Sequence, residues 1–154
     1  MEFRIRKKTA AGGVILTEII VSLGIIALYS ASALWGLSML NNQAAVARLY
    51  TGAQVVAQNQ IDLCLSDSPF NPQKNQIPPE LTVGTTVTNN VPLYIDPLSN
   101  QVVNTGTMTT VVTNTGSTLN GYNLNLYSIT VTVSWTYRGR SFNLKMSTMR
   151  ASDV

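Results

Sequence analysis

The chain contains no histidine and a single cysteine, Cys64, and these shortages exclude several kinds of chemistry. Without histidine, it lacks the usual general base and the commonest metal ligand. Its acidic residues are scattered and do not have the spacing of metal ligands. A single cysteine cannot close an internal disulfide, and we expect Cys64 to be a packing residue of a helix. We therefore expect a nonenzymatic protein that holds no metal and no cofactor.

Charge is scarce too, and it is unevenly distributed. Residues 1–13 hold four basic residues and one acidic residue, which together account for the whole net charge of +3. Between Val14 and Leu40 the only charged residue is Glu18. As a helix, that stretch would be roughly 40 Å long, more than the core of a bilayer needs. We therefore expect residues 14–40 to span a membrane once, with residues 1–13 held in the cytoplasm by their positive charge.

Glu18 requires an explanation, because a carboxylate in a membrane-spanning segment costs about 2.5 to 3.5 kcal/mol at the bilayer centre. A short basic stretch that ends in Gly13, followed by an apolar run with glutamate in the fifth place from Val14, resembles the amino terminus of type IV pilins and pseudopilins. Val14 departs from that family, in which phenylalanine is commonest at this place. The resemblance implies that a prepilin peptidase removes residues 1–13, that the new amine of Val14 is methylated, and that Glu18 contacts the amine of a neighbouring subunit.

The pairing of Glu18 also has a physical basis. Cleavage after Gly13 creates a positive amine about one helical turn from Glu18, and opposite charges attract strongly in a medium of low dielectric constant. Contact with the amine of a neighbour would neutralise both charges in a packed helical bundle and set the axial register of the subunits. The alternative is a carboxylate at the helix end that only reaches the membrane interface.

Two other interpretations of the apolar run remain open. Ala31-Ser32-Ala33 has the small-x-small form of a signal-peptidase site, and cleavage there would release a secreted protein that begins at Leu34. An unprocessed single-pass anchor is the second. Against the first, Glu18 interrupts the apolar region, and the run continues past the supposed cut as far as Leu40. The second leaves Glu18 and the pair Gly12-Gly13 unexplained.

Beyond the apolar run, the pattern predicts an amphipathic continuation of the helix over residues 41–65. We expect one side of it to carry Leu40, Ala44, Ala47, Tyr50 or Thr51, Gln54 and Ile61. The prolines that follow predict an irregular linker over residues 66–81. Residues 82–154 are rich in threonine, valine and asparagine, which predicts a β-rich head, with a mobile loop over residues 99–121 as the alternative for that tract.

The end of the chain has the pattern of a β-hairpin. Apolar residues alternate with threonine and serine from Ile129 to Tyr137, and Arg138-Gly139 supplies a two-residue turn. Pairing across this turn sets Trp135 opposite Phe142, Val133 opposite Leu144, and Val131 opposite Met146, which keeps one apolar face on both strands. We expect these six residues to form the head core and to cover the amphipathic helix, giving an α+β fold in which a long amino-terminal helix packs on a small antiparallel sheet.

The resemblance also implies partners and a location. These are other pilin or pseudopilin subunits, the prepilin peptidase, membrane lipid, and an inner-membrane assembly platform with its ATPase, because the chain has no nucleotide-binding loop. The head would lie in the periplasm of a bacterium before the subunit joins a filament in the periplasm or at the cell surface. Residues 44–65 and 127–135 are similar to V-type minor pilins and I-type pseudopilins. The basic residues Arg138, Arg140, Lys145 and Arg150 are a weak signal for nucleic acid, so service in DNA uptake stays an alternative.

Overall fold

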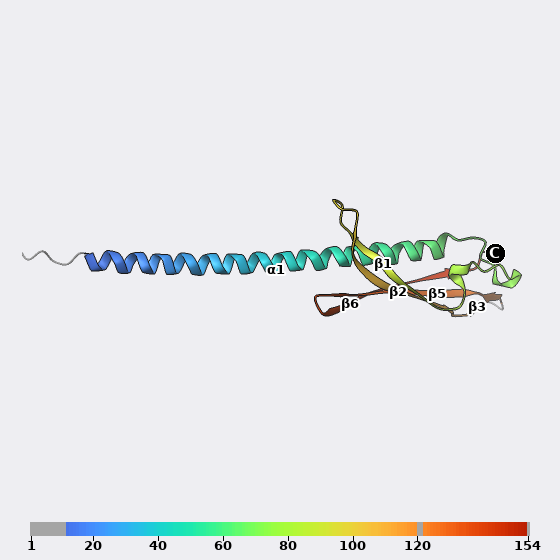
Figure 1. The fold of residues 1–154 in the computed structure, drawn as a ribbon. Coiled ribbons are helices and arrows are strands. Elements are labelled where there is room, and N and C mark those ends of the chain that lie inside the picture. The colour runs from blue at the N-terminus through green and yellow to red at the C-terminus, as the bar shows by residue number, and fades with distance from the viewer. Residues whose placement is uncertain (1–11, 120–121, 154) are drawn as a thin grey trace, which may run out of the picture. The chain divides into compact units, whose positions relative to one another are not determined.

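The fold is described from a computed structural model, which describes residues 12–119 and 122–153. The chain forms two compact units that meet at Ala44 and Ala45, and each is described by itself. In chain order the elements are the helix α1 (Gly12–Ser66), the 3₁₀ helices η1 (Pro72–Lys74) and η2 (Pro79–Leu81), and the strands β1 (Gly84–Ile95), β2 (Val102–Asn114), β3 (Ser117–Leu119), β4 (Tyr122–Leu124), β5 (Leu126–Tyr137) and β6 (Arg140–Ala151) (Figure 1). The basic residues of the expected leader fall within residues 1–11, outside the described residues.

The helix α1 extends through the apolar run and its amphipathic continuation. No proline interrupts the sequence before Pro69, and the helix ends at Ser66, one residue beyond the expected end. The first compact unit contains the apolar run, and the second begins inside the helix at Ala45. Because no proline interrupts it, α1 is continuous across the boundary between the two units.

The head contains a four-stranded antiparallel sheet in the order β1-β2-β5-β6, beside a small β3-β4 ribbon. With α1 packed on the sheet, the fold is α+β, as the sequence predicts. The strand β2 occupies residues 102–114, so the mobile loop considered for this tract is wrong over those residues. Its register places Thr107 opposite Ser134 and Asn114 opposite Tyr127.

The carboxy-terminal hairpin has the predicted register. Its cross-strand pairs include Trp135 with Phe142, Val133 with Leu144, and Val131 with Met146. Arg138 and Gly139 both have positive φ, 49° and 75°, as a type I′ turn requires. The three β5 residues of these pairs are buried, and the three β6 residues are partly buried against the same core.

The helix face that enters the head core differs from the expected one. The buried helix residues are Leu49, Ala53, Ala57, Ile61 and Cys64, whereas Tyr50, Gln54 and the other expected positions except Ile61 are exposed. The expected face continues from Leu40 and Ala44, whereas the buried residues form a row with a spacing of four from Leu49 to Ile61. At Gly52 an added Cβ would overlap the backbone oxygen of Leu93. Gly52, beside this row, therefore lets the helix backbone come close to β1.

The segment expected to be an irregular linker contributes to the core. It contains η1 and η2, and a bridge joins Asn71 to Gln76. Phe70 and Leu81 are both fully buried. Phe70 packs edge-on against Tyr127 of β5, with their ring centroids 4.8 Å apart. The segment thus closes one part of the head core as well as connecting the helix to β1.

Candidate functional site: the apolar helix and the head groove

The first candidate site is the apolar part of α1, whose large side chains are exposed. These are Ile15, Leu16, Ile19, Ile20, Val21, Leu23, Ile25, Ile26, Leu28, Tyr29, Leu34, Trp35, Leu37, Met39 and Leu40. Among the described residues, α1 is the one helix that is long and apolar enough to cross a membrane. So large an apolar surface is unstable in water and marks a region that contacts lipid or other protein.

Polar side chains in this part of the helix bond to its own backbone. Ser22 Oγ donates to the carbonyl oxygen of Glu18 at 2.8 Å, and Ser32 Oγ donates to that of Leu28 at 2.8 Å. Such bonds satisfy hydroxyl groups where no water is available. The carboxylate of Glu18 is different, because it forms no ion pair within the described part of the chain. Among the described residues, Glu18 is thus an exposed acidic group in an apolar stretch of α1.

The expected cleavage junction lies at the start of the helix. The backbone of Gly13 and Val14 belongs to the first turn of α1, and Val14 and Glu18 are four residues apart in the same helix. Residues at this spacing lie on the same side of a helix. The helix continues without a break through Ala33 and Leu34, where the alternative cut would fall.

At the other end of α1, the carboxy-terminal residues hold the helix in place. The guanidinium of Arg150 donates to the carbonyl oxygen of Cys64 at 2.7 Å, contacts Asp153 Oδ2 at 3.3 Å, and lies over the ring of Phe70 at 5.2 Å. Asp153 Oδ2 accepts from the backbone N–H of Phe70 at 2.9 Å, and the Asp153 N–H donates to the Phe70 carbonyl at 2.7 Å. Arg150 thus caps one of the last helix carbonyls, which lack partners within the helix.

Because Arg150 makes these contacts, it does not belong to a basic surface together with the other basic residues near the end of the chain. Arg150 is buried and used within the fold, whereas Arg138, Arg140 and Lys145 are exposed. Sequence reasoning grouped Arg150 with the other three. Its spacing of three residues from Asp153 was a signal of an ion pair, but the contact with Cys64, 86 residues away, had no local signal. Only three of the four basic residues are therefore exposed and available to contact nucleic acid.

Cys64 is fully buried on the helix face that meets the head core. Burial raises the pKa of its thiol, against a smaller lowering by the hydrogen bond from Gln60. Its Sγ lies 3.9 Å from Gln60 Nε2 and 3.7 Å from the carbonyl oxygen of Glu80. A buried thiol with a raised pKa is a poor nucleophile, so these contacts favour a packing role.

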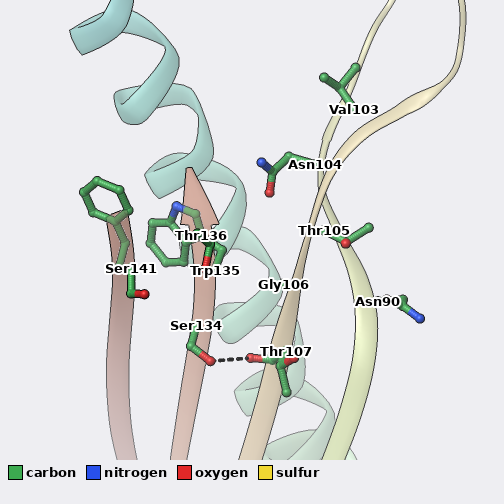
Figure 2. A pocket seen from close by; sticks show the side chains of 11 residues that line it. Asn90, Val103, Asn104, Thr105, Gly106, Thr107, Ser134, Trp135, Thr136 and Ser141 are labelled. Atoms are coloured by element: carbon green, nitrogen blue, oxygen red, sulfur yellow. Dashed lines mark hydrogen bonds between the residues drawn. The ribbon is translucent and has the colours of Figure 1, made fainter. Parts of the chain in front are cut away.

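The second candidate site is a groove in the head, with a volume of about 570 Å³, between β2 and β5. Figure 2 shows Asn104 and Thr105 on one side and Trp135, Thr136 and Ser141 on the other. Asn104 Oδ1 and Trp135 Nε1 are buried and have no hydrogen-bond partner among the described residues. No sequence pattern indicates this groove, because it depends on how the β1-β2 and β5-β6 pairs separate.

Within the described residues, no three acidic, cysteine or histidine side chains are placed to hold a metal ion. Comparison with family models, curated proteins and solved structures finds no significant match to this chain.

Proposed function

We propose that the chain is a nonenzymatic structural subunit, a minor pilin or pseudopilin, of a type IV pilus or a type II secretion-like filament. The observation that carries the proposal is Glu18, the only charge between Val14 and Leu40 in an exposed apolar helix that continues into a β-sheet head. Its place five residues from the expected cut is the one that the pilin resemblance requires. The same helix then serves as membrane anchor and as filament core.

The membrane stage follows from the exposed apolar surface of α1. Before assembly, lipid would cover the side chains between Ile15 and Leu40, which are exposed in the isolated chain. Residues 1–13 carry the positive charge that keeps the amino terminus in the cytoplasm. This orientation places the head in the periplasm, as a subunit of such a filament requires.

The filament stage requires other helices to replace the lipid. Packing α1 among identical or related helices would cover the same side chains, and small-residue positions such as Gly24 and Gly36 have open space around them for a neighbour. Glu18 has no ion pair in the described chain and would bond to the amine of a neighbouring Val14. The pair would keep both charges compensated as the subunit leaves the bilayer.

The proposal assigns the remaining steps to partner proteins. A prepilin peptidase would cut between Gly13 and Val14 and methylate the new amine, and an assembly platform with its ATPase would supply the work of extrusion. Service in DNA uptake remains an alternative within the same filament class. The burial of Arg150 leaves three exposed basic residues in the last segment, which weakens that alternative.

Processing is the direct test of this proposal. Intact mass and amino-terminal sequencing of the protein extracted from its native membrane should show a chain that begins at Val14 and carries an added methyl group. Gly13→Leu should leave the full-length precursor, because a side chain at the residue before the cut prevents close approach of the backbone to the peptidase. Gly12→Ala is a control in the neighbouring residue and should be processed. A mature chain that begins at Leu34 would show ordinary secretion and contradict the proposal.

A further inference from the structure

We propose that the groove between β2 and β5 binds an uncharged, hydroxyl-rich ligand, that is, a neutral glycan. The groove belongs to the head alone, and the inference does not depend on membership of a filament. It rests on the way the two strands separate, on the chemistry of the side chains that line the space, and on two buried polar atoms that lack partners.

The groove forms where the central strands part. In the described sheet, β2 and β5 pair from Asn114 opposite Tyr127 to Thr107 opposite Ser134, and the pairing ends there. Beyond that point β2 stays with β1 and β5 stays with β6. Gly106 stands at the fork, where an added Cβ would be 2.9 Å from the Ser134 carbonyl oxygen. The space left between the hairpins, about 570 Å³, is within the usual range for small-molecule sites.

The side chains that line this space are neutral and polar. Of the eleven described lining residues none is charged, and seven carry a hydroxyl or carboxamide group, including Asn90, Thr136 and Ser141. These groups both donate and accept hydrogen bonds, as the hydroxyl groups of a sugar do. An ionic ligand would lose its hydration without a compensating charge at this place. The lining therefore favours an uncharged ligand over an anionic or cationic one.

The two buried atoms without hydrogen-bond partners indicate which hydrogen-bonding groups the ligand must carry. Trp135, only 4% exposed, offers an indole N–H that can only donate, and Asn104 Oδ1 can only accept. Both residues line the groove, Trp135 from β5 and Asn104 from β2, although the two atoms themselves are covered by neighbouring atoms. Figure 2 shows Asn104 and Trp135 on opposite sides of the space. Buried polar atoms are rarely left unbonded, and an exception points to a missing water or ligand. Asn104 is only half-buried, so a turn of its side chain into the groove would uncover both atoms. A ligand hydroxyl would then supply an acceptor to the indole and a donor to the carboxamide.

The first test is binding by the full-length protein on an array of neutral and acidic glycans. A polyoxyethylene detergent is needed, because sugar-based detergents would compete for the groove. We expect retention of neutral glycans and affinity about fivefold to tenfold lower for Asn104→Leu, which loses one hydrogen bond. Asn143→Leu, an exposed change on β6 outside the groove, should bind as the wild type does. Failure to retain any neutral glycan, preference for charged glycans, or full binding by Asn104→Leu would each overturn the proposal.

A second measurement separates ligand binding from misfolding and from a bound water. Asn104→Leu removes an unpaired buried oxygen, so its melting temperature should not fall. The chain has two tryptophans, Trp35 and Trp135, which give two indole N–H signals in nitrogen-15 NMR spectra. Addition of a retained glycan should shift the Trp135 signal and leave the Trp35 signal in place. An unmoved Trp135 signal at saturating glycan would mean that water alone occupies the groove, and would contradict the proposal.

Discussion

Gly52 determines how closely α1 can approach the sheet. Replacing glycine with alanine inside a helix normally stabilises it by up to about 1 kcal/mol. At Gly52 we expect the opposite sign, because the new Cβ would overlap the backbone carbonyl of Leu93, a buried residue of β1. Overpacking of this kind costs about 1 to 3 kcal/mol. Gly52→Ala should therefore lower the melting temperature of the head, measured by circular dichroism of the full-length protein in detergent.

Gly36→Ala is the matched control, since the same substitution in the same helix meets no atom within 4 Å. It should leave the melting temperature of the head unchanged. Equal behaviour of the two variants, or stabilisation by Gly52→Ala, would show that the helix does not approach β1 as closely as described.

Single residues also show where sequence reasoning succeeds and fails. Glu18 is conspicuous because it is a lone charge among apolar residues, and such a signal is local. The role of Arg150 is not conspicuous, because its partners Cys64 and Phe70 are distant in sequence. A charged side chain near a chain end is usually exposed, and only the tertiary contact identifies a buried one.

At the scale of elements, the carboxy-terminal hairpin supplies a test of the head core. Trp135 packs between Tyr50 of α1 and Phe142 of β6, with ring centroids 6.1 and 5.8 Å away. Trp135→Ala should destabilise the head by about 3 to 5 kcal/mol, a large part of the stability of an ordinary domain. Thermal unfolding of the full-length protein would measure it. Thr136→Ala, the exposed neighbour on the same strand, should change the midpoint little, and an equal loss in both variants would contradict a specific packing role.

The elements differ in how far the sequence predicts them. Strict alternation and a two-residue turn specify β5 and β6 together with their register, because a slip of one residue would expose the apolar face. The register of β1 on β2 contains irregularities between Thr88 and Val91 and near Tyr94, which no alternation pattern encodes. The prediction of the helix face was wrong for another reason. Alanine lies both on the expected face, at Ala44 and Ala47, and on the buried one, at Ala53 and Ala57, so composition does not identify the side that packs on the sheet.

At the scale of the whole molecule, sequence predicts the α+β class but not the order of the strands. The central pair joins β2 to β5, and nothing in either strand identifies the other. The head groove forms because the pairing of β2 with β5 ends at Thr107. Since that pairing could not be predicted from the sequence, the groove could not be predicted either. The long apolar helix, in contrast, is evident in sequence and structure alike.

A single substitution, Glu18→Gln, tests whether Glu18 pairs with a neighbouring subunit during assembly. Glu18→Gln removes the only charge between Val14 and Leu40, so membrane insertion should be kept or slightly eased. Incorporation should fall, because the amine of the neighbour would be packed among helices with only a neutral partner, and loss of one member of a buried pair costs about 3 to 5 kcal/mol. Asp62→Asn, the same chemical change at an exposed position of α1 in the head, is the control and should assemble normally.

The deciding measurement is the amount of each variant recovered in sheared filaments, or crosslinked to other subunits if the filament is short, divided by its amount in the membrane fraction. We expect this ratio to fall at least tenfold for Glu18→Gln and to stay at the wild-type value for Asp62→Asn. A wild-type ratio for Glu18→Gln at normal membrane levels would contradict the pairing role and leave Glu18 as an interfacial residue of a membrane anchor.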